Sequence, residues 1–312
     1  VVAKAVDALR AFTVPVYLLP GNHDPLDPSS VYFDDAWIAH RPAHVTLIDE
    51  VEVVSVAGSP GIEVVGDPWR TKSRLTDPTA ACLQLGSPTG DALRVMVAHG
   101  VVDHLSPEDD GPSQIDSDAL RRGFSAGVVH YAALGDRHSV TEVRDTGGRA
   151  WYSGTPVATR QGLVDPNSVL VVTLDAASCT VEPRAVGSWA FLREERDVNG
   201  LADVEALGAW PDSRDSKATT VTKLGLRGTV SLSAGARLDD LLDEIGLKYA
   251  LLDSWDGRAD LVRSPDDDDL VNLEVSGYVR ETLDQLIAEA VGPGPAAIQA
   301  NEALSLLYRL AR

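Results

Sequence analysis

The sequence predicts an α/β fold in which a layered domain precedes a smaller α+β domain. Three observations support this prediction. Short apolar runs typical of buried strands are mixed with helical patterns over the first 190 residues. A polar, proline-containing stretch then interrupts the pattern, and a second mixture of strands and helices follows it. We therefore expect a first domain over 1–190, a linker over 191–214 and a second domain over 215–312.

The first domain begins with apolar residues at helical spacing over 5–12. Seven apolar runs then have the length and composition of strands. They cover residues 14–19, 51–57, 62–65, 93–98, 128–134, 149–153 and 169–174. Helical patterns lie between several of them, at 75–85 and 117–124. Because several of the strands are apolar at consecutive positions, we expect both faces of the sheet to be covered.

The second domain has a different order of elements. The pattern predicts strands at 218–232, 248–253, 258–262 and 270–279 and helices at 238–245 and 281–290. In the second helix Leu283, Leu286, Ile287 and Ala290 recur at the spacing of one buried face. A Gly-Pro break follows, and 296–312 forms a last helix that we expect to pack on its own domain.

The composition is that of a globular chain with a large acidic excess. The 312 residues are 44% hydrophobic and 24% charged, and the formal net charge is -20. The acids are spread over both halves, so the basic footprint typical of sequence-independent DNA binding is missing. No apolar run approaches the roughly 20 residues of a membrane helix, and Cys82 and Cys179 form no metal-binding pair. We therefore expect a cytoplasmic protein with free thiols and no membrane partner.

Four polar motifs each follow a predicted strand. They are Gly21-Asn22-His23-Asp24, Ala98-His99-Gly100, Gly135-Asp136-Arg137-His138 and Tyr152-Ser153-Gly154-Thr155-Pro156. In α/β folds ligand sites assemble at the carboxyl ends of strands, so these motifs are expected to lie together. They supply imidazole, carboxylate and amide donors, which suit Mn²⁺, Fe²⁺ or Zn²⁺. Arg137 and Arg160 lie near the motifs and are candidate phosphate contacts.

In their order and their positions after strands, these elements resemble the calcineurin-like metallophosphoesterases. Tyr131-Ala132-Ala133-Leu134-Gly135 and the Tyr-Ser-Gly-Thr-Pro motif are similar to the DNA repair exonuclease branch, the SbcD-type nuclease subunits. The similarity spans residues 1 to about 190 and continues more loosely beyond. It implies a layered β-sandwich flanked by helices, followed by a small α+β capping domain that also binds a partner.

The resemblance also implies a site for two divalent ions, usually Mn²⁺, at which a phosphodiester is hydrolysed. Carried over by motif, Asn22, His99 and Asp136 would bind one ion and His138 the other. His23 would lie beside the phosphate, where it stabilises the transition state or protonates the leaving oxygen. An imidazolium can supply the proton that an alkoxide leaving group needs.

The chain departs from the family pattern in two ways. Asp136 stands where the family usually has the first histidine of Gly-His-x-His, and a carboxylate is an acceptable hard donor. The family's Asp-x-His and Gly-Asp elements, which supply further ligands, do not precede Asn22. We therefore expect that this polypeptide resembles a truncated reading frame and does not hold both ions tightly on its own.

Three functions remain open on the sequence. The first is a DNA exonuclease or endonuclease subunit in DNA repair, which by resemblance acts on DNA with a coiled-coil, SbcC-like ATPase subunit and can form a homodimer. The second is a phosphodiesterase for a nucleotide or another small phosphodiester, which suits the acidic composition better. The third is a catalytically inactive binding or scaffold module, because part of the metal site is missing.

Overall fold

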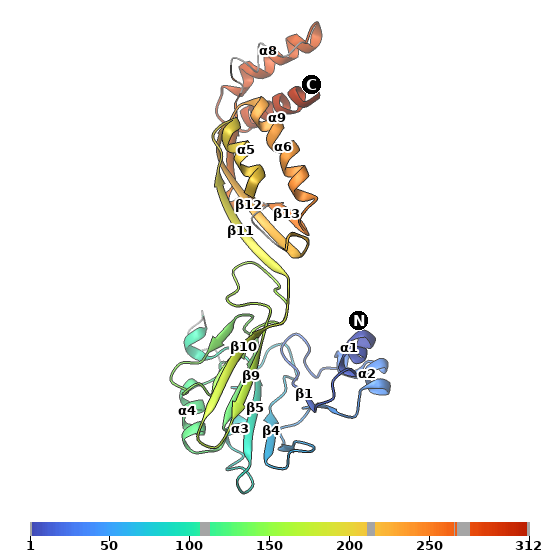
Figure 1. Ribbon diagram of the computed structural model, residues 1–312, viewed down its shortest axis with the longest axis vertical. Coiled ribbons are helices and arrows are strands. Elements are labelled where there is room, and N and C mark those ends of the chain that lie inside the picture. The colour runs from blue at the N-terminus through green and yellow to red at the C-terminus, as the bar shows by residue number, and fades with distance from the viewer. Residues whose placement is uncertain (1, 107–112, 211–215, 265, 267–274, 311–312) are drawn as a thin grey trace. The chain divides into compact units, whose positions relative to one another are not determined.

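The computed structural model describes residues 2–106, 113–210, 216–264, 266 and 275–310 (Figure 1). The chain has mixed α/β structure and divides into two compact units. The first comprises Val1–Thr159 and Leu163–Gly187, and the second comprises Arg160–Gly162 and Ser188–Arg312. Each unit has a hydrophobic core built from its own residues.

A six-stranded sheet forms the centre of the first unit. Its strands are β3 (Val54–Ser55), β4 (Ile62–Gly66), β5 (Leu93–His99), β6 (Tyr131–Gly135), β7 (Val140–Glu142) and β8 (Ala150–Ser153). The strand order is β3-β4-β5-β6-β8-β7, with β4, β5, β6 and β8 parallel and the two edge strands antiparallel to their neighbours. The carboxyl ends of β5 and β6 therefore lie at the same edge of the sheet.

Helices α3 (Ala80–Leu83) and α4 (Ser117–Ser125) contribute to the core of this sheet. Residues of β5 alternate between buried and half-buried, and Met96 and Ala98 are its buried apolar residues. They join Leu120 of α4 and Cys82 of α3 in one cluster. Since neighbouring residues of a strand point to opposite faces, His99 lies on the other face from Met96 and Ala98.

Two smaller sheets complete the first unit. The parallel pair β1 (Val16–Leu18) and β2 (Val45–Leu47) packs with α1 (Val2–Leu9), the 3₁₀ turn η1 (Val31–Phe33) and α2 (Asp35–His40) around a second apolar cluster. The antiparallel pair is β9 (Ser168–Leu174) and β10 (Cys179–Ala185). The loop that carries Asn22 follows β1.

The second unit has a four-stranded parallel sheet. It consists of β11 (Ala190–Asp197), β12 (Thr220–Val230), β13 (Leu251–Ser254) and β14 (Asp260–Arg263). Helices α5 (Leu201–Ala209) and α6 (Leu232–Gly246) pack on one face, and α8 (Tyr278–Ala290) and α9 (Pro295–Leu310) form a further apolar cluster with the start of α6. No helix in the described part of the chain is long and apolar enough to cross a bilayer.

The structure confirms mixed α/β architecture, and every strand predicted in the first domain overlaps an observed strand. The irregular linker expected over 191–214 is wrong, because this range holds most of β11 and all of α5. Part of the strand predicted over 270–279 lies outside the described residues, and its end is instead the start of α8. The last helix packs on α8 and α6, as expected.

Candidate functional site

Three of the predicted site residues come together at the carboxyl edge of the central sheet. His99 ends β5, and Asp136 directly follows Gly135 at the end of β6, the residue paired with His99 in the ladder. The His99 Nε2 lies 3.0 Å from the Asn22 Oδ1 and 3.5 Å from the Asp136 Oδ1. An imidazole, an amide oxygen and a carboxylate therefore face one another.

Two glycines make room for the His99 ring. A Cβ at Gly21 would lie 2.8 Å from ring atoms of His99, and a Cβ at Gly135 would lie 3.0 Å from its Nδ1. Both distances are shorter than ordinary carbon contacts. The glycines of the first and third motifs thus allow the Asn22 loop and the end of β6 to approach the imidazole closely.

Trp69 braces the same histidine, and sequence reasoning missed this role. Its Nε1–H donates a hydrogen bond of 2.6 Å to the His99 carbonyl, and its ring meets the imidazole edge to face at 5.9 Å. Its backbone N–H donates to the Pro20 carbonyl and its carbonyl accepts from the Leu26 N–H. Trp69 therefore ties the loop of Asn22 to the end of β5. The sequence feature that could have indicated this role is the position of Trp69 three residues after the end of β4, at the carboxyl edge of the sheet where His99 also lies.

Asp24 fixes the shape of the Asn22 loop. One carboxylate oxygen accepts from the Gly21 N–H at 2.9 Å, and the other accepts from the Tyr32 hydroxyl at 2.6 Å. Burial raises the pKa of Tyr32, and the hydrogen bond to Asp24 raises it further, so the phenol remains a proton donor. The loop residues on either side of Asn22 are thereby held in place.

The backbone of Asp136 has an unusual conformation. Its φ is 102°, in a region that residues with a side chain rarely adopt. Such a conformation costs about 1–3 kcal/mol and persists where the surroundings determine it, which is common at functional sites. The carboxylate near His99 is therefore held at an energetic cost.

The other predicted site residues do not join this group through any contact among the described residues. His23 is exposed, although it directly follows Asn22 in the same loop. Arg137 and His138 are also exposed; the Arg137 Nε–H donates to the Thr141 Oγ1, and the His138 Nδ1 lies 3.1 Å from the Thr159 Oγ1. Arg160 is exposed and belongs to the second unit.

The donor set can be tested against a divalent ion. Within the described ranges no group of three or more His, Cys, Asp or Glu side chains is placed to hold a metal ion. The group at the sheet edge has two such residues, His99 and Asp136, and the amide oxygen of Asn22 is its third donor. One nitrogen and two oxygen donors fit a borderline-hard ion that keeps water at its remaining positions.

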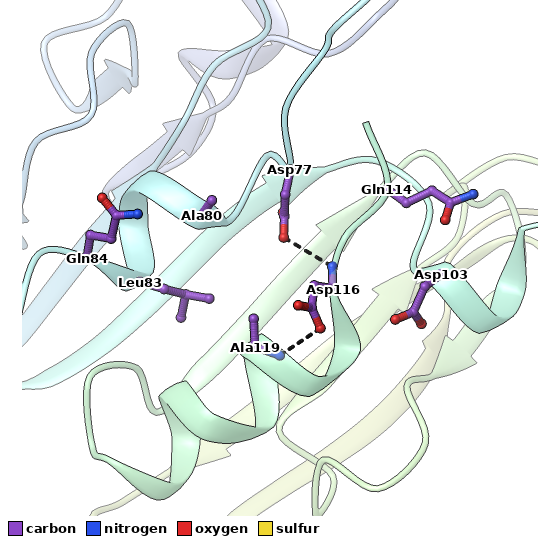
Figure 2. Close-up of a pocket in the computed structure, with 8 residues that line it drawn as sticks. All are labelled: Asp77, Ala80, Leu83, Gln84, Asp103, Gln114, Asp116 and Ala119. Carbon is purple, nitrogen blue, oxygen red and sulfur yellow. Dashed lines mark hydrogen bonds between the residues drawn. The ribbon is translucent and has the colours of Figure 1, made fainter. Parts of the chain in front are cut away.

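A cavity of about 650 Å³ lies elsewhere in the first unit, between α3 and the start of α4. Figure 2 shows three of its carboxylates, those of Asp77, Asp103 and Asp116. Asp77 accepts from the Asp116 N–H, and Asp116 caps α4 by accepting from the Ala119 N–H. These hydrogen bonds give Asp77 and Asp116 a structural role, and none of the predicted site residues lines the cavity.

Comparison with known proteins adds no family to this geometry. No protein-family model matches the chain, and no curated protein matches it significantly.

Proposed function

We propose that this protein is a metal-dependent phosphoesterase of the calcineurin-like type, with the layered architecture of that family, that hydrolyses phosphodiester bonds in DNA. The observation that carries the proposal is the convergence of Asn22, His99 and Asp136 from three strand ends on one point. The motif order in the sequence supports it. Both cysteines are free thiols, in keeping with a cytoplasmic location.

Each residue has a defined task in this proposal. Asn22, His99 and Asp136 hold one divalent ion, most suitably Mn²⁺, with Fe²⁺ or Zn²⁺ as the second choice, and His138 provides a ligand for a second ion. Bound ions supply Lewis acidity and lower the pKa of water, which makes a nucleophile at neutral pH. His23, exposed beside Asn22, protonates the leaving oxygen. Arg137, exposed and next to Asp136 in the sequence, binds a substrate phosphate.

Measurement of Mn²⁺ binding and hydrolysis on His99→Gln and Asp136→Asn tests the proposal. Either change removes a donor, so we expect Mn²⁺ affinity, followed by titration calorimetry, to fall at least about 10-fold. Hydrolysis of end-labelled linear DNA and of bis(p-nitrophenyl) phosphate should fall with it. Because His138 stands apart from the other donors, metal analysis of the native chain should give fewer than two tightly bound ions.

Two matched variants serve as controls. Asp145→Asn makes the same change at an exposed aspartate with positive φ, and His40→Gln makes it at an exposed histidine on α2. Both should bind Mn²⁺ like the native chain. Hydrolysis of the small diester but not of DNA would change the substrate to a small phosphodiester. Equal Mn²⁺ affinity in all variants, with no metal-dependent hydrolysis, would overturn the proposal in favour of an inactive binding module.

A further inference from the structure

The parallel sheet of the second unit has a core face and an open face. Side chains alternate along a strand, and Thr222, Leu224 and Leu226 of β12 are buried on the side of α5 and α6. The alternate residues Lys223 and Arg227 are half-buried and exposed, respectively. β11 pairs with β12 in register, so Arg193, opposite Lys223, lies on the same open face.

An aromatic ring with two guanidinium groups close to it marks this open face. Trp255 directly follows β13, and the Arg193 and Arg258 guanidinium carbons lie 5.2 and 5.8 Å from its ring centre. Gly225 of β12 permits this arrangement, because a Cβ there would lie 3.0 Å from the Arg258 Cβ and carbonyl oxygen. Arg258 therefore lies directly over the sheet, with Trp255 beside it.

The cations of this face are only partly neutralised. Glu195 lies 3.3 Å from Arg227 and 3.8 Å from Arg258. Within the described residues, Arg193 and Lys223 have no carboxylate within 4.0 Å, although Asp253 is next to Lys223 in the ladder. In a chain of net charge -20, a cation without a carboxylate partner beside an aromatic ring, Arg193, and a second one opposite it in the ladder, Lys223, stand out.

We propose that the open face, defined by Arg193, Lys223, Trp255 and Arg258, binds single-stranded nucleic acid. Unpaired bases stack on aromatic rings and on guanidinium planes, and Lys and Arg side chains neutralise the phosphates between them. A duplex keeps its bases stacked inside and cannot use Trp255 in this way. The segment 160–162 borders the face, since a Cβ at Gly162 would lie 3.9 Å from the Arg193 guanidinium.

Fluorescence anisotropy of a labelled 20-nucleotide oligo-dT with the full chain, in EDTA and low salt, tests this proposal. We expect Arg193→Glu and Trp255→Ala each to weaken binding about 10-fold, because one base–aromatic stack is worth about 1–3 kcal/mol. Trp255→Phe should retain most of the affinity. Arg280→Glu, the same charge change at the exposed Arg280 of α8, should weaken binding less than about 2-fold.

Competitors decide which ligand the face takes. Unlabelled oligo-dT or oligo-rU should displace the probe, whereas duplex DNA of equal length should do so at least about 10-fold less well. Equal competition by heparin, or equal affinity of Trp255→Ala and the native chain, would overturn the proposal, because a polyanion surface does not need stacking. Equal losses in Arg193→Glu and Arg280→Glu would overturn it too. Since EDTA removes divalent ions, the result does not depend on hydrolysis at the Asn22–His99–Asp136 group.

Discussion

At the scale of single residues, the imidazole of His99 is held by close contacts on several sides. Gly21, Gly135 and Trp69 surround it. The sequence predicted that His99, Asn22 and Asp136 would meet, since each follows a strand and parallel strand ends share an edge. It did not predict Trp69, because a tryptophan near a strand is ordinarily a core residue. Nor could it predict the strained φ of Asp136, which tertiary contacts determine.

The space at Gly21 leads to a stability prediction. A Cβ there would lie 2.8 Å from the His99 ring, so Gly21→Ala forces the imidazole or the loop to move. We expect urea denaturation to show a loss of about 1–3 kcal/mol in unfolding free energy, and NMR to show shifted His99 ring resonances. Gly61→Ala is the control, because nothing lies within 4 Å of a Cβ at that position. Equal stability of the two variants would mean that the close contact is unimportant.

At the scale of secondary-structure elements, the charged residues of β11 explain why this strand was predicted as a linker. β11 was expected to be part of a linker because the sequence becomes polar here, and the second half of the strand, residues 193–197, is wholly charged. In the structure most of those side chains are paired, with Arg196 beside Glu194 and Arg227 beside Glu195, whereas Arg193 has no carboxylate partner among the described residues. A strand with this many charged residues has no apolar pattern, so its pairing with β12 could not be inferred from its own sequence.

The buried pair Arg94–Glu63 joins β4 to β5 and should control acid stability. The Arg94 Nε and Nη2 donate to the Glu63 Oε2 at 3.0 and 2.8 Å, with both residues nearly inaccessible to solvent. Burial alone would raise the pKa of Glu63, but hydrogen bonds from Thr89 and Arg94 outweigh it and hold the pKa below its usual range. Ionised Glu63 therefore stabilises the fold above the unfolded pKa of about 4.3, and this contribution is lost as the pH falls through the folded pKa.

Glu63→Gln leaves the Arg94 guanidinium buried without a counter-charge. At pH 7 we expect a loss of about 3–5 kcal/mol in unfolding free energy, and a smaller difference from the native chain below about pH 4. Glu50→Gln is the matched control: Glu50 pairs with Arg70 at 2.8 Å, but half or more of each side chain is exposed, so its loss should be below about 1 kcal/mol. A difference independent of pH would contradict the role given to the ionised carboxylate.

At the scale of the whole molecule, each of the two units has its own hydrophobic core. The cluster that contains Met96 and Tyr152 includes only first-unit residues, and the one that contains Leu238 and Val204 includes only second-unit residues. Composition alone showed that the sequence changes from apolar to polar near residues 184 to 190, because the apolar strands of the first unit end there. It could not show that a parallel strand, β11, begins directly after this change, because β11 is recognised as a strand only through its pairing with β12.

Separate cores predict separate responses to a core mutation. Leu238 of α6 is fully buried in the second unit, so Leu238→Ala should cost about 2–5 kcal/mol there. In the full chain, hydrogen exchange measured by mass spectrometry should show lost protection in peptides from β12 and α6, while peptides from β5 and β6 keep theirs. Leu247→Ala is the control, because Leu247 is 90% exposed and its truncation should change protection in neither unit. Lost protection in both units with Leu238→Ala would show that the two cores unfold as one.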